Sequence, residues 1–244
     1  MGDWGYCIKD CKTCGGIGYI RYDVPIHDEN FGKMFPCPNR KFVEWDNTIG
    51  IDVEEAKTLD WKSYIQNDAI REMRRAYDNV LERGWGWLYI HGEPGNGKTI
   101  MAKSATVYAR NVLDIPVKYR KMSEVINHVR SSYDADNGQG LYLKRLEEWS
   151  RLKMLVIDEV GRDRQTDFSK QSLSDLMDAR YQSSIKKRSI TVWVSNFAPS
   201  EIFESYLLDR VADGRHFIVH IKGKSVRPML DDTKTLSKAW WLDY

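Results

Sequence analysis

Residues 92–99 read Gly-Glu-Pro-Gly-Asn-Gly-Lys-Thr, which has the spacing G-x-x-x-x-G-K-[ST]. The apolar run at residues 85–91 predicts a buried strand before it, and residues 98–111 have a helical pattern after it. Glycines in such a turn let backbone N–H groups surround phosphate oxygens at the start of the helix. We therefore predict an ATP site with Mg²⁺ held by the Thr99 hydroxyl; its nucleotide-binding residues are Gly92, Pro94, Gly95, Asn96, Gly97, Lys98, Thr99 and Ile100.

Strands and helices alternate along the rest of the chain. Apolar runs predict strands at residues 117–119, 153–159, 189–195 and 217–221, and helical patterns lie at residues 98–111, 123–132, 141–152, 169–185 and 199–211. Residues 53–83 also carry apolar side chains at helical spacing, with Gly84 as a stop, which predicts one amphipathic helix. The alternation predicts an α/β fold in which helices cover both faces of a parallel sheet.

Two carboxylates end the strand predicted at residues 153–159. Asp158 is placed to hold Mg²⁺ through water, and Glu159 to orient and polarise the water that attacks the γ-phosphate. Asn196 ends the next strand, where its amide can reach the γ-phosphate, although a lone Asn after a strand is more often a turn former. With the glycine-rich loop upstream, these residues predict ATP hydrolysis.

Residues 61–228 resemble the DnaC/DnaI/IstB group of AAA+ ATPases. The resemblance rests, in order, on the polar helix, the loop at residues 92–99, Val-Ile-Asp-Glu-Val-Gly at 156–161, Ser-Asn at 195–196, Leu-Asp-Arg at 208–210 and a late Gly-x-Ser-x-Arg ending at Arg227. It implies that Asn196 is sensor 1, that Arg210 is an arginine finger acting across a subunit interface, and that Arg227 is sensor 2. Val226 stands where the group usually has Tyr, and the short stretch after Arg227 predicts an AAA+ domain without a separate helical lid.

The four cysteines, Cys7, Cys11, Cys14 and Cys37, lie at the N-terminal end of the chain. Four thiolates can close a tetrahedral zinc site, and the glycines after Cys14 allow a tight knuckle. The pattern resembles the zinc modules of some phage and bacterial helicase loaders, in which a second Cys-x-x-Cys follows; here Arg40 takes its final position. We assign Cys7 as the compensating ligand, with His27 as the substitute if Cys7 is not a ligand.

These observations divide the chain into four expected segments. Residues 1–48 form a zinc-binding, helicase-interaction module, 49–83 a linker with the amphipathic helix, 84–231 the AAA+ core and 232–244 a tail. The chain has 244 residues, a formal net charge of +2, no long apolar stretch and no secretory signal pattern, so we expect a protein of the bacterial cytoplasm, possibly phage-encoded.

The resemblance implies an ATP-dependent loader that places a DnaB-type replicative helicase on single-stranded DNA and self-associates through its ATP sites. The DNA would contact the segment that begins Tyr119-Arg120-Lys121, with Tyr119 stacking on a base and Arg130 nearby, although a solvated basic stretch is an equal alternative. The main alternative is an IstB-type ATPase that regulates transposition on duplex DNA. A binding module with a degenerate loop is a third possibility, opposed by the presence of Lys98 and Glu159.

Overall fold

The computed structural model describes residues 5–6, 11–15, 17–38, 41–42, 47–59, 61, 68–131, 138–162 and 166–222. Its centre is a five-stranded sheet with the strand order β6-β7-β8-β5-β9, in which every neighbouring pair is parallel. The strands are β5 (Gly86–Gly92), β6 (Val117–Lys121), β7 (Met154–Val160), β8 (Ile190–Ser195) and β9 (Phe217–Ile221). Because all strands are parallel, their carboxyl ends meet at one edge of the sheet.

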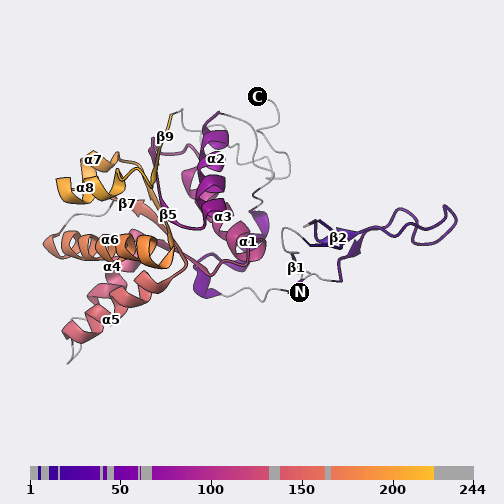
Figure 1. Cartoon of the computed structure of the whole chain (residues 1–244), viewed down its shortest axis with the longest axis horizontal. Coiled ribbons are helices and arrows are strands. Elements are labelled where there is room, and N and C mark those ends of the chain that lie inside the picture. The colour runs from indigo at the N-terminus through magenta and orange to yellow at the C-terminus, as the bar shows by residue number, and fades with distance from the viewer. Residues whose placement is uncertain are drawn as a thin grey trace, which may run out of the picture.

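Helices cover both faces of this sheet (Figure 1). One face carries α1 (Val53–Thr58), α2 (Asp68–Arg83) and α3 (Lys98–Asn111). The other carries α4 (Met122–Arg130), α5 (Gly138–Arg151), α6 (Asp167–Lys187), α7 (Pro199–Ile202) and α8 (Ser205–Val211). The predicted α/β fold, with a parallel sheet between two helical layers, is confirmed.

Successive side chains of a β-strand point to opposite faces of the sheet, so a central strand packs against both helical layers. In β5, Leu88 and Ile90 pack with α2 and α3, whereas Trp87 and Tyr89 pack with the layer that contains α6. All four side chains are buried, so β5 is apolar on both faces, as expected for a central parallel strand. The strand thereby brings its carboxyl end, and the loop that follows it, to the middle of the sheet edge.

Two of the predicted helices are each broken in the structure. The helix predicted at residues 53–83 was wrong as one element: α1 ends at Thr58 because Leu59 is extended (φ −92°, ψ 107°). The break buries Trp61, whose ring packs against Tyr77 and Tyr108. The helix predicted at residues 199–211 likewise breaks at Phe203, whose extended backbone directs its ring into the core beside Tyr89.

A fully buried arginine on α6 forms hydrogen bonds to the amino ends of two strands of the sheet. The guanidinium of Arg180 donates to the carbonyls of Leu152 and Ile190 and to the hydroxyl of Thr191. Burial lowers its pKa to about 9, because the charged guanidinium loses its contact with water. These bonds satisfy backbone groups at the amino ends of β7 and β8 and so fix the sheet on which the loops rest.

The described N-terminal residues form two short antiparallel pairs rather than helices. β1 (Gly5–Tyr6) pairs with β4 (Lys41–Phe42), and β2 (Tyr19–Ile20) pairs with β3 (Phe35–Pro36). A short 3₁₀ turn, η1 (Asn47–Ile49), then contacts β6. Within the described part of the chain, no helix has the length and apolar character needed to cross a membrane.

Candidate nucleotide site and cysteine cluster

The loop after β5 has the backbone conformation that its glycines predict. Gly95 and Gly97 both have φ of +88°, a region that L side chains rarely adopt. At Gly92, a Cβ atom would lie 2.1 Å from the carbonyl oxygen of Ile221 at the end of β9, so a side chain has no room there. The loop therefore turns tightly into α3, and Thr99 and Ile100 are exposed in the first turn of that helix.

Lys98 is enclosed by this loop. Its ammonium donates to the carbonyl oxygens of Gly92 (2.7 Å) and Glu93 (2.8 Å) and to the side-chain oxygen of Asn96 (3.0 Å). Asn96 in turn donates to the carbonyl of Ile221 (3.2 Å). A buried cation inside a loop of positive-φ glycines at a helix N-terminus is the donor set that a nucleotide phosphate requires. The residues present thus fit the phosphates of ATP.

Asp158 lies at the end of β7 and is only 2% exposed. Its Oδ2 accepts a hydrogen bond from the hydroxyl of Tyr119 (2.6 Å), and its Oδ1 accepts one from the backbone N–H of Glu159 (2.7 Å). Burial and the neighbouring carboxylate raise the pKa of Tyr119, so the phenol keeps its proton and donates it to Asp158. A carboxylate held in this way is an oxygen ligand of the kind that Mg²⁺ prefers, directly or through water.

Glu159 has a left-handed backbone (φ +59°), which is unusual for a residue with a side chain. Its carboxylate forms ion pairs with Lys121 (3.2 Å) and Arg162 (2.8 Å). Lys121 is at the end of β6, the strand that pairs with β7, and lies in register with Asp158. The acid expected to polarise water is therefore paired with two cations from its own chain.

Asn196 follows β8 and is exposed, at the same edge of the sheet as Glu159. The turn there is fixed by Ser195, whose hydroxyl donates to the carbonyl of Val160 (2.7 Å) and accepts from the N–H of Phe197 (3.0 Å). The structure thus brings Lys98, Asp158, Glu159 and Asn196 to the carboxyl ends of three adjacent strands. Such an edge is where open α/β sheets bind ligands.

Arg210 is on α8, in the helical layer opposite α3. Its guanidinium forms an ion pair with Asp178 on α6 and lies over the rings of Tyr181 and Tyr206. Arg227, the expected sensor 2, is outside the described residues.

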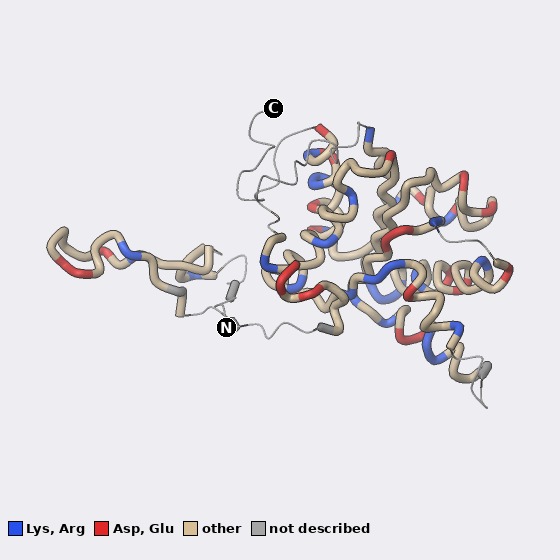
Figure 2. The backbone as a smooth tube through the Cα atoms, turned by 180° about the vertical axis from the view of Figure 1, so that it is seen from behind, with Lys and Arg blue, Asp and Glu red and all other residues tan. Residues whose placement is uncertain are grey.

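Most side chains of the expected DNA-contacting segment make contacts within their own chain. Stacking of Tyr119 on a base was a wrong prediction, because the ring is 3% exposed and its hydroxyl bonds to Asp158. Arg120 donates to the carbonyls of Thr48 and Ile49, and Lys121 pairs with Glu159. Arg130 is exposed. Figure 2 shows Lys and Arg interspersed with Asp and Glu along the backbone of the molecule.

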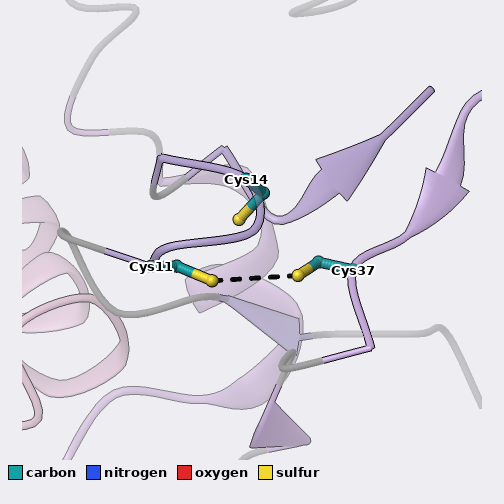
Figure 3. A group of neighbouring side chains, drawn as sticks. All are labelled: Cys11, Cys14 and Cys37. Carbon is teal, nitrogen blue, oxygen red and sulfur yellow. Dashed lines mark hydrogen bonds between the residues drawn. The ribbon is translucent and has the colours of Figure 1, made fainter. Parts of the chain in front are cut away.

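Three cysteines converge in the N-terminal part of the chain (Figure 3). The sulfurs of Cys11, Cys14 and Cys37 lie within 4.8 Å of one another, and those of Cys11 and Cys37 are 3.9 Å apart. A tetrahedral site with Zn–S bonds of ~2.3 Å places neighbouring sulfurs ~3.8 Å apart. The three thiols therefore fit three corners of a zinc site.

The turn around Cys14 has the features of a metal-binding knuckle. The backbone N–H of Gly18 donates to the Cys14 sulfur (3.3 Å), and Gly15 and Gly18 both have positive φ. Such N–H donors stabilise a thiolate. Cys7 lies outside the described residues, and His27 is exposed and is not part of the cluster. The assignment of the fourth ligand stays a prediction.

One family model, described as IstB-like ATP binding protein, matches residues 85–233, more than half of the chain. The chain belongs to the IstB-like ATP-binding protein family. This family membership establishes the region around the loop and β7 as an ATP-binding domain. No curated protein matches the sequence significantly.

Solved structures of low sequence identity share the fold of this IstB-like domain. A DnaC helicase loader has a TM-score of 0.56 at 16% identity, covering 70% of this chain and 100% of the other. A DnaI structure has a TM-score of 0.52 at 15% identity, covering 70% and 92%. AMPPCP-bound DnaA from Aquifex aeolicus has a TM-score of 0.57 at 16% identity, covering 70% and 52%. This IstB-like chain thus spans about half the length of the DnaA protein it resembles.

Proposed function

We propose that this IstB-like protein hydrolyses ATP. Lys98 and the loop N–H groups would hold the phosphates, and Thr99 and Asp158 would hold Mg²⁺, which supplies charge neutralisation at the transferring phosphoryl group. Glu159 would polarise the attacking water once its carboxylate leaves Lys121 and Arg162, and Asn196 would orient that water. Detectable ATP turnover would exclude a pure binding module with a degenerate loop.

The proposed arginine finger requires self-association. A phosphoryl transition state needs added positive charge, which is often supplied by an arginine from a neighbouring molecule. Arg210 lies on α8, away from its own loop, and would complete the site of an adjacent subunit; Arg227 would act within its own subunit. ATP hydrolysis would then be coupled to assembly and release of the oligomer.

We further propose that the N-terminal cysteines bind Zn²⁺. Cys11, Cys14 and Cys37 supply three ligands with suitable sulfur spacing, and Cys7 is proposed as the fourth. A segment with only two-residue strands gains stability from such a metal, because its own hydrophobic core is small. This zinc module, residues 1–48, would contact the partner protein.

The function that these features support best is loading of a DnaB-type replicative helicase onto single-stranded DNA. The observation that carries the proposal is the cysteine cluster ahead of an ATP-binding domain whose fold matches that of the DnaC helicase loader. A DnaA structure of the same fold has been solved with single-stranded DNA and AMPPCP, at a TM-score of 0.54. Arg130, which is exposed, stays a candidate contact for phosphates.

The first test is fluorescence anisotropy with labelled single-stranded and duplex DNA, each with and without a non-hydrolysable ATP analogue. ATP-dependent preference for the single strand, followed by capture of a purified DnaB-type helicase, supports the loader. A variant lacking residues 1–48 should lose the helicase but keep ATP binding. If neither DNA form nor the helicase binds, the loader proposal is wrong.

The second candidate is an ATPase that regulates transposition on duplex DNA, as in IstB-type systems. It is favoured by the family match over residues 85–233. The same anisotropy experiment separates the two, because ATP-dependent preference for duplex DNA supports the transposition regulator.

A further inference from the structure

The pair Tyr119–Asp158 joins two neighbouring strands at the nucleotide edge of the sheet. Tyr119 comes from β6 and Asp158 from β7, and their side chains are 3% and 2% exposed. The phenol donates to one carboxylate oxygen, and the backbone N–H of Glu159 donates to the other. Two donors on two different oxygens fix the rotation of the carboxylate about its Cβ–Cγ bond.

Tyr119 is itself held on both sides. The ammonium of Lys103, on helix α3, lies 5.5 Å from the centre of the Tyr119 ring. The same ammonium forms an ion pair with Glu55 on α1 (2.6 Å). The next residue, Arg120, donates to the carbonyls of Thr48 (2.6 Å) and Ile49 (2.9 Å). The phenol is thereby fixed relative to both α3 and the segment that precedes α1.

We infer that Tyr119 is a positioning residue of the nucleotide site, which holds the carboxylate of Asp158 in the orientation that receives the Mg²⁺-bound nucleotide. This inference rests on the proposed function of that site. Each carboxylate oxygen has two lone-pair directions, so a hydrogen bond to each leaves one direction on each oxygen for the cation or its water. Without the phenol, the buried Oδ2 loses its donor, and the carboxylate is no longer held on both oxygens.

The test is the Mg²⁺ dependence of nucleotide binding by the full chain, read by the fluorescence of a labelled ATP analogue without turnover. Tyr119→Phe removes only the hydroxyl. Tyr77→Phe is the matched control, because Tyr77 belongs to the same hydrophobic cluster, is fully buried, and its hydroxyl has no hydrogen-bond partner among the described residues. Thermal unfolding of both variants is measured in parallel.

We expect Tyr119→Phe to need about tenfold more Mg²⁺ for half-maximal binding, which corresponds to the loss of one hydrogen bond to a charged group. Binding in EDTA should equal that of the wild type, and Tyr77→Phe should match the wild type throughout. The inference is overturned if Tyr119→Phe keeps the wild-type Mg²⁺ dependence, whatever its stability, or if both variants shift alike. A wild-type chain that binds no nucleotide overturns the proposed function and this inference together, whereas an unchanged Tyr119→Phe overturns the inference alone.

Discussion

The guanidinium of Arg210, on helix α8, forms an ion pair with the carboxylate of Asp178, on helix α6 of the same chain. The two side chains are 26% and 47% exposed, and the rings of Tyr181 and Tyr206 flank the guanidinium. The two side chains are partly exposed, although the atoms that meet, Nη1 of Arg210 and Oδ1 of Asp178, are buried. For the proposed finger role, Arg210 would have to leave Asp178 for the nucleotide of a neighbouring subunit.

Replacement of this arginine should separate ATP binding from turnover. We expect Arg210→Ala to bind ATP as the wild type does and to lose at least ~10³-fold in the rate of hydrolysis, the scale known for arginine fingers. Steady-state phosphate release measures this, with Arg151→Ala as the control, because Arg151 is exposed and pairs with Glu147 within its own helix. Normal turnover by Arg210→Ala would reject the finger assignment.

Removal of the loop lysine should abolish nucleotide binding. Lys98→Ala deletes the ammonium and its bonds to the carbonyls of Gly92 and Glu93, so the phosphates lose their main cation. We expect an affinity loss of at least ~100-fold, measured by titration with a fluorescent ATP analogue. Lys144→Ala, at an exposed position of α5, should bind normally. Tight binding by Lys98→Ala would show that nucleotide binds elsewhere.

A neutral residue at position 159 should trap ATP. Glu159→Gln keeps the shape of the side chain but removes the charge that polarises water, and it also removes the ion pairs with Lys121 and Arg162. We expect ATP to bind at least as well as in the wild type and hydrolysis to fall by ~10²-fold or more. Single-turnover hydrolysis measures this directly. An unchanged single-turnover rate would assign the general base to another residue.

The cysteine cluster predicts stoichiometric zinc. Metal analysis of the purified protein should give one Zn²⁺ per chain, and Cys37→Ser should lose it because one corner of the site is removed. Cys7→Ser should lose zinc as well, whereas His27→Ala should retain it, since the His27 side chain is outside the cluster. Zinc retained by Cys7→Ser and lost by His27→Ala would reverse the assignment of the fourth ligand.

His216 should make the fold sensitive to acid. Its ring stacks on Trp87 and its Nδ1 accepts from the Trp87 backbone N–H, and burial lowers its pKa from 6.5 to about 4. Over the pH range between these two values, the unfolded chain therefore binds a proton at His216 that the folded chain does not bind. Stability should be complete above pH 6.5 and fall as the pH drops from 6.5 to about 4, by at most ~1.4 kcal/mol per pH unit.

Urea unfolding at several pH values measures this dependence. His216→Asn keeps an acceptor near the Trp87 N–H without a titrating ring, so its stability should fall less steeply over the same window. An identical slope in the variant would place the acid sensitivity elsewhere.

Local sequence was sufficient for most of the fold. Helix α3 and strand β9 begin and end where they were predicted, because Gly97 limits the helix at one end and alternating apolar residues define the strand. The breaks at Leu59 and Phe203 were missed, since helical spacing continues through both positions. The backbone conformation at these two breaks depends on the burial of Trp61 and Phe203 against rings that are distant in the sequence. Local residue spacing does not encode such tertiary contacts.

The placement of the candidate site residues in the fold was predictable, but their contacts were not. The positions of Lys98 at the start of α3, and of Asp158 and Glu159 near the end of β7, follow from their places in the sequence. Stacking of Tyr119 on a base was wrongly predicted, because its contact with Asp158 depends on β6 lying beside β7. The ion pair of Lys121 with Glu159 was not predicted for the same reason. Strand order in a parallel sheet is set by crossover connections, which residue patterns along one strand do not encode.

Gly92 packs closely against the end of β9, so the glycine-rich loop and this strand are directly joined. The Ile221 carbonyl oxygen lies 2.1 Å from the position that a Cβ of Gly92 would take, and the same oxygen accepts from the Asn96 side chain within the loop. Any side chain at position 92 would therefore push against Ile221, so a substitution there would disturb β9 as well as the loop.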